Sequence, residues 1–596
     1  MDQRRSELLA QRSHQWAAVA AACFCMLLAR LAWIQVVRHS YYLEKAKKAV
    51  GRHWSIPAPR GRILDRNEVP LAQNLKLYTI AADPALMSDL ASVAKQLAPA
   101  LCMPEEQLLS LLNGEKEGHA PPSKPLRFVR LRESVDEPVA KAVAALDLPG
   151  LIVTPSWKRA YPLGSAGAAL LGFVGDDLGG QSGIEARFNK TLAGTPGEMF
   201  AMVDGRLPRS RAQIPGGSVV EKEMRPGETV MLTLDLTLQR IADAALAEAV
   251  QNAHAKGGTA IIMDPKTGEV LALATQPSFD PNQYQAFPPT SWVCQAVTSP
   301  YEPGSTFKSI TACAALEEGV FSHGETITCS GTRAVGNRVI GCALHGGSRG
   351  HGQVDLHSMI VRSCNVGLGT VALALGPDRL HKWVARLGFG ARTGIEVPGE
   401  TNGLLTPSKS WSQIQTANVG FGQGVSVTPI QLLSAYCTIA NGGFRVRPHV
   451  LRATMSESGV QPASLPAPER VLSPATVDFM KKALQGVVEE PHGTGNSVRV
   501  PGRTVAGKTG TAQKPVPGMG YHSGKYIGSF VGFAPVSQPR MGVIVVIDEP
   551  QGVHYGGVVA APAFQKIMEK GLAYLQVPQD ASLKGAPTGP AGSAAE

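Results

Sequence analysis

The sequence is poor in the features that mark small disulfide-stabilised proteins or nucleic-acid-binding proteins. Its nine cysteines are an odd number spread over 596 residues, which excludes a disulfide-dense scaffold. It has neither zinc-finger spacing nor the aromatic run of RNA-binding motifs. Nucleic acid is therefore the weakest of the partners that suit a net charge of +10, behind anionic lipid and an acidic polymer. Charged residues make up 17% and hydrophobic residues 44%, which argues against wholesale disorder.

One long apolar run is present, and it lies near the N-terminus. Residues 16–37 read WAAVAAACFCMLLARLAWIQVV, which is long enough for a helix to cross a hydrocarbon core of about 30 Å. No A-x-A cleavage site follows, so we expect a retained transmembrane anchor. Three arginines precede the run and five basic residues follow it within residues 38–52, the reverse of the pattern for an exported C-terminus. Large domains translocate largely regardless of such charges, so the orientation is left to the chemistry.

Composition divides the rest of the chain into two regions and a tail. Residues 38–225 combine a basic neck, helical patches and Gly/Pro-rich loops. Residues 229–575 open with a strand-like run, an amphipathic helix and a hairpin of two β-rich runs joined by Pro-Lys-Thr-Gly. Residues 576–596 are small, polar and rich in Pro and Gly, which predicts a disordered tail.

The motif S-T-F-K carries the candidate nucleophile, Ser305. Pro303 and Gly304 precede a run with helical spacing, so Ser305 is expected at or near a helix start, where free N–H groups favour negative charge. Lys308 then lies beside it, because residues i and i+3 are neighbours on a helix. Lys308 can act as base only when neutral, which requires burial or a nearby cation such as Lys508. Alone, such a motif is more typical of an N-cap serine and a solvated lysine.

The motif S-C-N at 363–365 follows a helix-like run, so Ser363 and Asn365 are expected on a loop at its end. By itself this motif is common and indicates nothing.

The motif K-T-G-T at 508–511 lies in a strand-like alternation. Thr509 and Thr511 are expected on one face, and Lys508 and Gly510 on the other. Gly510 would let a ligand approach the backbone closely. The three motifs in this order are the signature of β-lactamases and penicillin-binding proteins, and together they are far more specific than any one of them.

From the anchor to about residue 573 the chain resembles class B penicillin-binding proteins, the monofunctional peptidoglycan transpeptidases. Beyond the motifs, the resemblance rests on RGRILDRN (60–67), SGIEARFNKTLAGTPG (182–197), YEPGSTFK (301–308), FGQGVSVTPIQL (421–432), AGKTGTAQK (506–514) and KYIGSFVGFAP (525–535). The ending VVIDEPQGVHYGGVVAAPAF is similar to the division-specific, FtsI-like branch. Asn67-Glu68 departs from the Asn-Gly that is usual in the family, in the N-terminal module and not at the catalytic site.

The resemblance implies the roles of individual residues. The catalytic residues would be Ser305, Lys308, Ser363 and Lys508. The substrate-binding residues would be Asn365, Thr509, Gly510 and Thr511. Ser305 would attack the penultimate D-Ala carbonyl of a pentapeptide stem, with Lys308 as base, while backbone N–H groups of Ser305 and Thr511 form the oxyanion hole. Ser363 and Lys508 would pass the proton to the leaving amine, Asn365 would hold the stem amide, and the two threonines would bind the substrate carboxylate.

The resemblance also implies an architecture and a location. The fold would be an α/β (α+β) transpeptidase domain (229–575) on an elongated N-terminal pedestal (38–225), preceded by one transmembrane helix (16–37) and a cytoplasmic tail (1–15). The catalytic domain would lie outside the bacterial cytoplasmic membrane. Expected partners are stem peptides, β-lactams, the membrane, a polytopic glycosyltransferase and divisome proteins, with no nucleic acid and no cofactor. Alternatives are an elongation-type transpeptidase, a D,D-carboxypeptidase or β-lactamase, and a non-catalytic scaffold or sensor.

A group of cysteines and histidines lies outside these motifs. It comprises Cys329, Cys342, His345, His351 and Cys364. Such residues at mixed spacing are candidates for tetrahedral zinc binding. A Cys329–Cys342 disulfide and separate reduced thiols are the alternatives, and the sequence leaves all three open.

Overall fold

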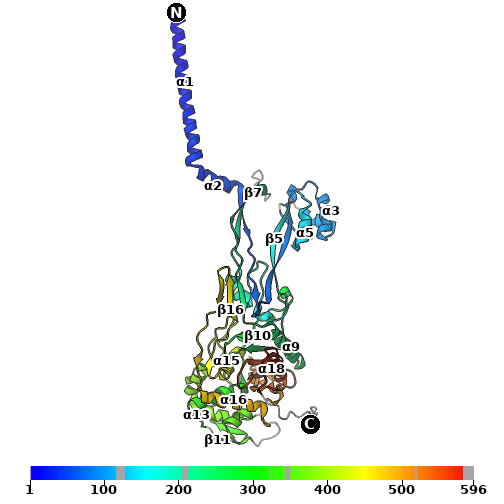
Figure 1. The fold of residues 1–596 in the computed structure, drawn as a ribbon, viewed down its shortest axis with the longest axis vertical. Coiled ribbons are helices and arrows are strands. Elements are labelled where there is room, and N and C mark those ends of the chain that lie inside the picture. The colour runs from blue at the N-terminus through cyan, green and yellow to red at the C-terminus, as the bar shows by residue number, and fades with distance from the viewer. Residues whose placement is uncertain are drawn as a thin grey trace. The chain divides into compact units, whose positions relative to one another are not determined.

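The chain forms two compact units (Figure 1). The computed structural model describes residues 2–115, 126, 128–203, 213–322, 324–342, 350–516, 518 and 520–580. The first unit comprises residues 1–59, 74–158 and 194–226, and the second comprises 60–73, 159–193 and 227–596.

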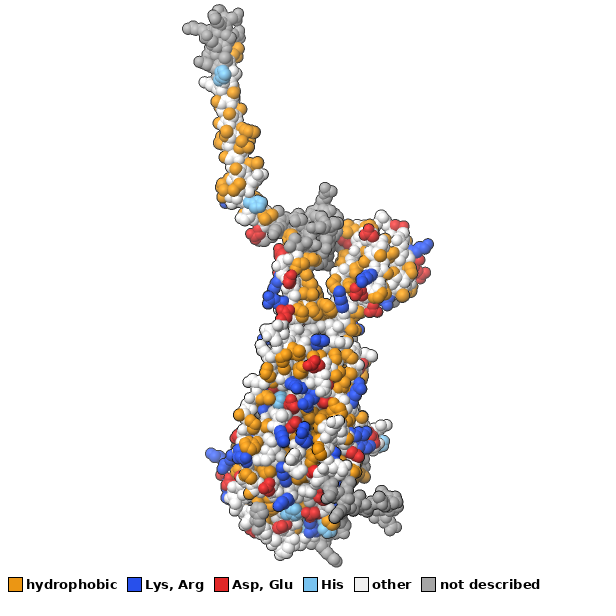
Figure 2. Space-filling model, in the orientation of Figure 1, with side chains coloured by type: hydrophobic (Ala, Val, Ile, Leu, Met, Phe, Trp, Pro, Cys, Tyr) orange, Lys and Arg blue, Asp and Glu red, His pale blue; other side chains and the backbone are white. Residues whose placement is uncertain are grey.

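The first unit begins with a helix that is long and apolar enough to cross a membrane. Helix α1 (Asp2–Ala32) continues into the π-helical segment η1 (Trp33–Val37). Within them, residues 12–37 have a mean hydropathy of 2.1 in their most apolar window. Apolar side chains are exposed along this segment (Figure 2), including Leu27 and Leu28. An exposed apolar helix of this length suits a lipid environment, in agreement with the predicted anchor.

The rest of the first unit is a mixture of short helices and long strands. Its elements are α2 (His39–Val50), β1 (Gly51–Ile56), most of β3 (Pro70–Ala82), α3 (Leu90–Leu101), α4 (Glu105–Asn113), β4 (Val129–Val135), α5 (Glu137–Ala144), β5 (Leu151–Ala160), β6 (Gly197–Val203) and β7 (Gln213–Lys222). Strands β1, β6 and β7 form a three-stranded sheet, while β4 and β5 both pair with β3. Helices α3, α4 and α5 share a core that includes Leu97, Leu108 and Val143.

The second unit is built on a five-stranded antiparallel sheet in the order β10-β9-β21-β20-β19. Its strands are β9 (Gly257–Met263), β10 (Val270–Gln276), β19 (Ala506–Gln513), β20 (Tyr526–Ala534) and β21 (Met541–Asp548). Every residue of β9 is buried, because alternate side chains enter two different cores. Ile262 packs with α9 (Leu236–Asn252) and α18 (Ala561–Tyr574), whereas Ile261 packs with the helices of the other face. The predicted hairpin is the β9–β10 pair.

Further elements of the second unit surround this sheet. The helices are α6 (Ala168–Leu171), α7 (Gly183–Arg187), α8 (Asn189–Leu192), α10 (Gln295–Thr298), α11 (Lys308–Glu317), α12 (Leu356–Val361), α13 (Asn365–Arg386), α14 (Gln413–Gly420), α15 (Pro429–Ala440), α16 (Pro474–Glu489) and α17 (Gly556–Val559). The strands are β2 (Ile63–Leu64), β8 (Thr229–Leu232), β11 (Thr326–Cys329), β12 (Thr332–Val335), β13 (Arg338–Gly341), β14 (Gly352–Asp355), β15 (Phe444–Arg445), β16 (Leu451–Ser456), β17 (Gly459–Pro462) and β18 (Glu469–Arg470).

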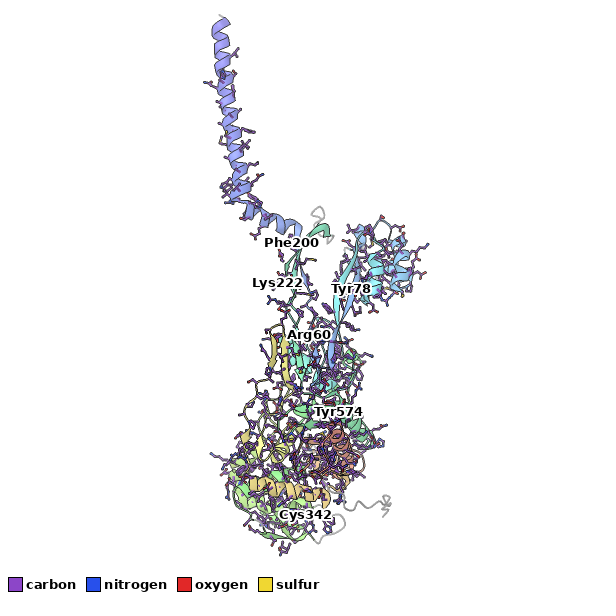
Figure 3. All side chains as sticks on the ribbon, in the orientation of Figure 1. Arg60, Tyr78, Phe200, Lys222, Cys342 and Tyr574 are labelled. Atoms are coloured by element: carbon purple, nitrogen blue, oxygen red, sulfur yellow. The ribbon has the colours of Figure 1, made fainter. Side chains whose placement is uncertain are left out.

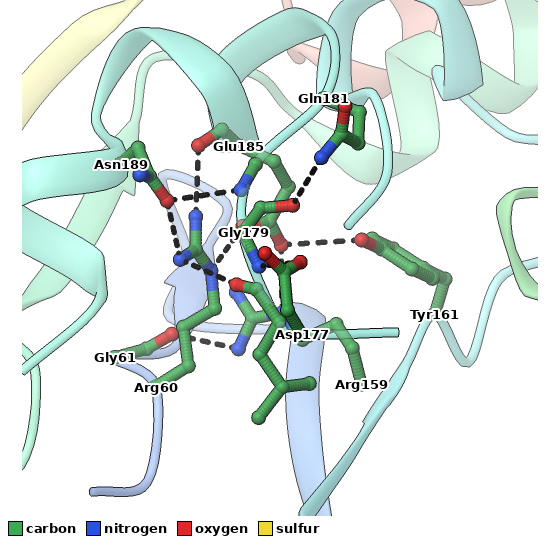
Figure 4. A network of polar contacts seen from close by, with 11 residues as sticks. Arg60, Gly61, Arg159, Tyr161, Asp177, Gly179, Gln181, Glu185 and Asn189 are labelled. Atoms are coloured by element: carbon green, nitrogen blue, oxygen red, sulfur yellow. Dashed lines mark hydrogen bonds and ion pairs between the residues drawn. The ribbon is translucent and has the colours of Figure 1, made fainter. Parts of the chain in front are cut away.

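Two segments from the predicted pedestal, 60–73 and 159–193, belong to the second unit. A buried ion network joins them (Figure 4). The Glu185 carboxylate accepts hydrogen bonds from Nε of Arg60 and Nε of Arg159, both at 2.6 Å, and Arg60 Nη1 also donates to Asn189 Oδ1 at 2.8 Å. Strand β2 pairs in parallel with β8. These long-range pairings carry both segments into the second compact unit, so the two units interleave along the sequence.

The end of the described chain packs onto the second unit. Asp580 accepts hydrogen bonds from the Thr504 backbone N–H at 2.8 Å and from the Ser537 hydroxyl at 3.0 Å. Gln576, Val577 and Asp580, which fall inside the predicted tail, are thus hydrogen-bonded, and residues 581–596 lie outside the described part.

Candidate active site

Ser305 and Lys308 lie on one turn, where the 3₁₀ segment η5 (Gly304–Phe307) runs into α11. The Lys308 Nζ donates to Ser305 Oγ at 3.0 Å. Ser305 is partly exposed, whereas the Lys308 side chain is completely buried. The structure therefore brings together the predicted nucleophile and base, with only the serine open to a ligand.

Three contacts hold this turn in place. Gly304 has a φ of 55°, and a Cβ there would lie 2.6 Å from the Thr511 carbonyl oxygen, so only glycine lets the turn approach β19 this closely. The Thr306 hydroxyl donates to the Pro303 carbonyl at 2.8 Å, and the Tyr436 hydroxyl donates to the Thr306 carbonyl at 2.8 Å. The approach to β19 places the Ser305 turn beside Thr511.

Ser363 lies between α12 and α13, and its two oxygen atoms contact the same Lys308 amine that contacts Ser305. The Lys308 Nζ donates to Ser363 Oγ at 2.9 Å and to its carbonyl oxygen at 2.6 Å. Ser363 has a φ of 57°, a left-handed conformation that non-glycine residues adopt at a cost of about 1 kcal/mol or more. Such strain persists only where surrounding contacts impose it, and here it directs both oxygens of Ser363 to one amine.

Asn365 is the first residue of α13 rather than a loop residue. Its side-chain Nδ2 donates to the Gly341 carbonyl oxygen at 2.8 Å. The end of β13 thus orients the side-chain amide.

Lys508 is completely buried on β19 and lies among hydroxyl groups. Its Nζ donates to Thr494 Oγ1 and to Thr509 Oγ1, each at 3.3 Å, and the Thr509 hydroxyl donates to Thr494 Oγ1 at 3.0 Å. Alternation along a strand predicts opposite faces for Lys508 and Thr509. The long lysine side chain nevertheless reaches the threonine hydroxyl. Thr494 was not identified from the sequence, where its only signal is the flexible string HGTGN.

Gly510 and Thr511 complete the edge of the site. A Cβ on Gly510 would lie 2.3 Å from Ser529 Oγ, so no larger residue fits without moving its neighbours. The Thr511 hydroxyl accepts from the Gly556 backbone N–H at 3.1 Å, which fixes the threonine at the N-terminus of α17.

The two lysines are electrostatically unusual. Burial lowers the pKa of Lys308 to about 8, an effect that negative charge on Cys342 and Cys364 opposes. Burial, followed by the charge of Lys308, holds the pKa of Lys508 well below its usual value. Neither lysine forms an ion pair within the described part of the chain. The site therefore favours a neutral amine beside a serine hydroxyl, which is the pairing needed to generate a nucleophile at moderate pH.

The arrangement supports acyl transfer. It offers a hydroxyl nucleophile, a neutral amine within hydrogen-bonding distance, and a second hydroxyl on the same amine. The backbone of β19 beside the nucleophile can supply an N–H group to a developing oxyanion.

The cysteine–histidine group lies close to this site. Ligand atoms of Cys329, Cys342, His351 and Cys364 all lie within 4.8 Å of one another. His345 lies outside the described residues. All nine cysteines are free, so the Cys329–Cys342 disulfide is not formed in this structure.

Family models match most of the chain. Residues 258–569 match the penicillin-binding protein transpeptidase domain, and residues 55–232 match the penicillin-binding protein dimerisation domain. The first range contains all eight predicted site residues.

Known proteins resemble the chain over nearly its whole length. Stage V sporulation protein D of Bacillus subtilis is 34% identical over 93% of this chain and 84% of that protein. The peptidoglycan D,D-transpeptidase FtsI of Escherichia coli is 33% identical over 95% of this chain and 93% of that protein. Among solved structures, penicillin-binding protein 3 of Mycobacterium tuberculosis complexed with aztreonam has a TM-score of 0.67 and 28% identity, covering 89% of this chain and 98% of that one.

Proposed function

The chain belongs to the class B penicillin-binding proteins, and from that premise we propose that it is a peptidoglycan D,D-transpeptidase that works through an acyl-enzyme at Ser305. The observation that carries the residue assignment is the contact of the Lys308 amine with both Ser305 Oγ, at 3.0 Å, and Ser363 Oγ, at 2.9 Å. A single buried amine can accept the proton from the nucleophile and pass it on through the second hydroxyl.

The proposed reaction has two halves. Ser305 Oγ attacks the carbonyl carbon of the penultimate D-Ala as its proton passes to neutral Lys308, and backbone N–H groups of Ser305 and Thr511 stabilise the oxyanion. The C–N bond to the terminal D-Ala then breaks, and the leaving amine takes a proton through Ser363, with Lys508 beside it. In the second half, the amine of another stem peptide attacks the Ser305 ester, and Ser305 regains its proton.

Substrate recognition follows from the other residues of the site. The Asn365 amide, oriented by Gly341, holds the stem peptide, and the hydroxyls of Thr509 and Thr511 bind the substrate carboxylate. Gly510 keeps the strand open to a close approach. A β-lactam presents an acyl group and a carboxylate with the same spacing, so it would acylate Ser305 and remain there.

The N-terminal helix supports a membrane location. We propose residues 1–15 as a cytoplasmic tail, 16–37 as a single-pass anchor in the cytoplasmic membrane, and the rest of the chain outside, because peptidoglycan lies there. Residues 38–225 would form the pedestal, 229–575 the transpeptidase domain and 576–596 the tail.

A polytopic glycosyltransferase and divisome proteins are the proposed partners, and septal wall synthesis is the proposed role. Depletion should give filaments, whereas rounded cells would indicate elongation.

Labelling with a fluorescent penicillin tests the enzymatic proposal. We expect one covalent adduct per chain, mapped by peptide mass spectrometry to Ser305 and absent from Ser305→Ala. Ser410→Ala, which removes an exposed hydroxyl that donates to the Pro407 carbonyl, is the matched control and should label normally. An unlabelled wild-type chain, or equal labelling of Ser305→Ala, would favour a non-catalytic scaffold.

A further inference from the structure

A cluster of three sulfur atoms and one imidazole includes the cysteine of the S-C-N motif and lies at the end of the second unit that carries β11 and α13 (Figures 1 and 3). Its four members come from four different elements. Cys329 ends β11, Cys342 follows β13, His351 precedes β14, and Cys364 caps α13. These residues converge because the two-stranded sheets β11–β14 and β12–β13 meet the N-terminus of α13 there.

Three of the six ligand-to-ligand distances in the cluster match the edges of a tetrahedral zinc site, and all six are within 4.8 Å. With Zn–S bonds of about 2.3 Å and Zn–N bonds of about 2.0 Å, tetrahedral ligands lie about 3.8 Å apart for S···S and about 3.5 Å apart for S···N. The Cys329 and Cys342 sulfurs are 3.7 Å apart, as are those of Cys342 and Cys364. Cys329 Sγ lies 3.5 Å from His351 Nδ1.

The same distances disfavour a disulfide. A disulfide needs sulfurs about 2.0 Å apart and joins only two cysteines. Here Cys342 is equidistant from two partners, so no pair is singled out.

The surroundings of the cluster suit metal-bound thiolates. The Gly367 backbone N–H donates to Cys364 Sγ at 3.2 Å, and the Val366 N–H donates to Cys342 Sγ at 3.4 Å. Such N–H donors orient and stabilise sulfur ligands in metal sites. They belong to the first turn of α13, where the helix dipole also favours negative charge. Cys329 and Cys364 are fully buried, so the site is closed to solvent on that side, as structural zinc sites are.

We propose that Cys329, Cys342, His351 and Cys364 bind one structural Zn²⁺ ion, which fixes the backbone that carries Ser363 and Asn365. Cys364 stands between these two residues, and Cys342 follows Gly341, whose carbonyl orients Asn365 at 2.8 Å. One ion would thereby tie both sides of Asn365 together and hold Ser363 in its left-handed conformation. The positioning role, though not the metal binding, rests on the proposed transpeptidase function.

Metal analysis of the full chain, purified in detergent under reducing and chelator-free conditions, tests the site. We expect about one zinc per chain, and Co²⁺ in its place should give thiolate charge-transfer and tetrahedral d–d absorption bands. Cys342→Ser should fall below about 0.2 zinc per chain, whereas the exposed-cysteine control Cys102→Ser should keep its zinc. Wild-type protein with less than about 0.2 zinc per chain and no cobalt–thiolate band, or with a disulfide by intact mass, would overturn the proposal.

Acylation measurements test the positioning role separately. We expect zinc-free protein, prepared from the wild type with a strong chelator, to react with fluorescent penicillin at least about tenfold more slowly, and to recover with Zn²⁺ but not with Mg²⁺. Unchanged acylation of zinc-free, folded protein would overturn this role. Zinc without any labelling would contradict the transpeptidase function and leave the metal site intact, and labelling without zinc would do the reverse.

Discussion

The second unit contains two buried clusters of basic side chains, and only one of them includes a carboxylate. Around Glu185, two arginines flank one carboxylate at 2.6 Å each. Around Ser305, two fully buried lysines have hydroxyl and carbonyl oxygens for neighbours and no carboxylate in the described ion pairs. The shared carboxylate makes the first group part of the framework, whereas burial lowers the pKa of both amines in the second group and so favours the neutral form that a base requires.

Substitution of Lys308 should give the largest effect on the acylation rate without lowering the stability of the fold. Lys308→Met removes the base, so the rate of acylation by penicillin should fall by about 10³-fold or more. Stability should hold or rise, because a buried amine without a carboxylate is replaced by a thioether of similar length. Stopped-flow labelling and thermal unfolding measure the two. Lys481→Met, a partly buried lysine on α16, is the control, and a Lys308→Met enzyme with near-normal acylation would contradict the assignment.

Substitution of Glu185 should do the opposite. Glu185→Gln removes the carboxylate that the buried Arg60 and Arg159 share, which should cost about 3–5 kcal/mol of unfolding free energy. Acylation of the protein that remains folded should stay within a few-fold of the wild type. Urea unfolding with penicillin labelling of the folded fraction measures both. A Glu185→Gln protein that unfolded like the wild type but was no longer acylated by penicillin would contradict the structural role of Glu185.

Thr494 offers a smaller test inside the site. Thr494→Val removes a hydroxyl that Lys508 and Thr509 both contact, so acylation should slow by about tenfold, the equivalent of about one buried hydrogen bond. Thr494→Ser keeps the hydroxyl and should retain most of the rate. Equal rates for valine and serine would show that Lys508 does not depend on this contact.

Glu68 gives the smallest expected effect. It has a φ of 65°, which explains why the family usually has glycine at this turn. Glu68→Gly should therefore raise the unfolding free energy by about 0.5–1 kcal/mol, after the greater chain entropy of glycine is subtracted. Glu68→Ala should give no such gain, since alanine also disfavours this conformation. Chemical denaturation measures the difference, and destabilisation by glycine would contradict the argument.

The sequence predicted the features that depend on neighbours along the chain. The Ser305–Lys308 turn, the β9–β10 hairpin and the apolar N-terminal helix all follow from local periodicity, and the order of the three motifs indicated the fold. Asn365 was expected on a loop but begins α13, because Cys364 acts as the helix cap.

Features that depend on distant pairing could not be derived from local periodicity, although the resemblance placed Ser363 and Lys508 in the same site as Lys308. The contact of Lys308 with Ser363 spans 55 residues, and that of Lys508 with Thr494 crosses from a loop to a strand. The inclusion of residues 60–73 and 159–193 in the second unit rests on Arg60, Glu185 and a parallel strand pair. The cysteines were visible as a group, but only the meeting of β11, β13, β14 and α13 selects which atoms face one another.

The pH dependence of acylation tests the central claim most directly. Because burial lowers the pKa of Lys308 to about 8, the amine is protonated and inactive below that pH and becomes the base above it. The acylation rate constant for penicillin at Ser305 should therefore rise about tenfold per pH unit on the acid side and level off above the pKa. A rate that stays constant, or falls, as the pH rises through 8 would contradict the role of a neutral lysine.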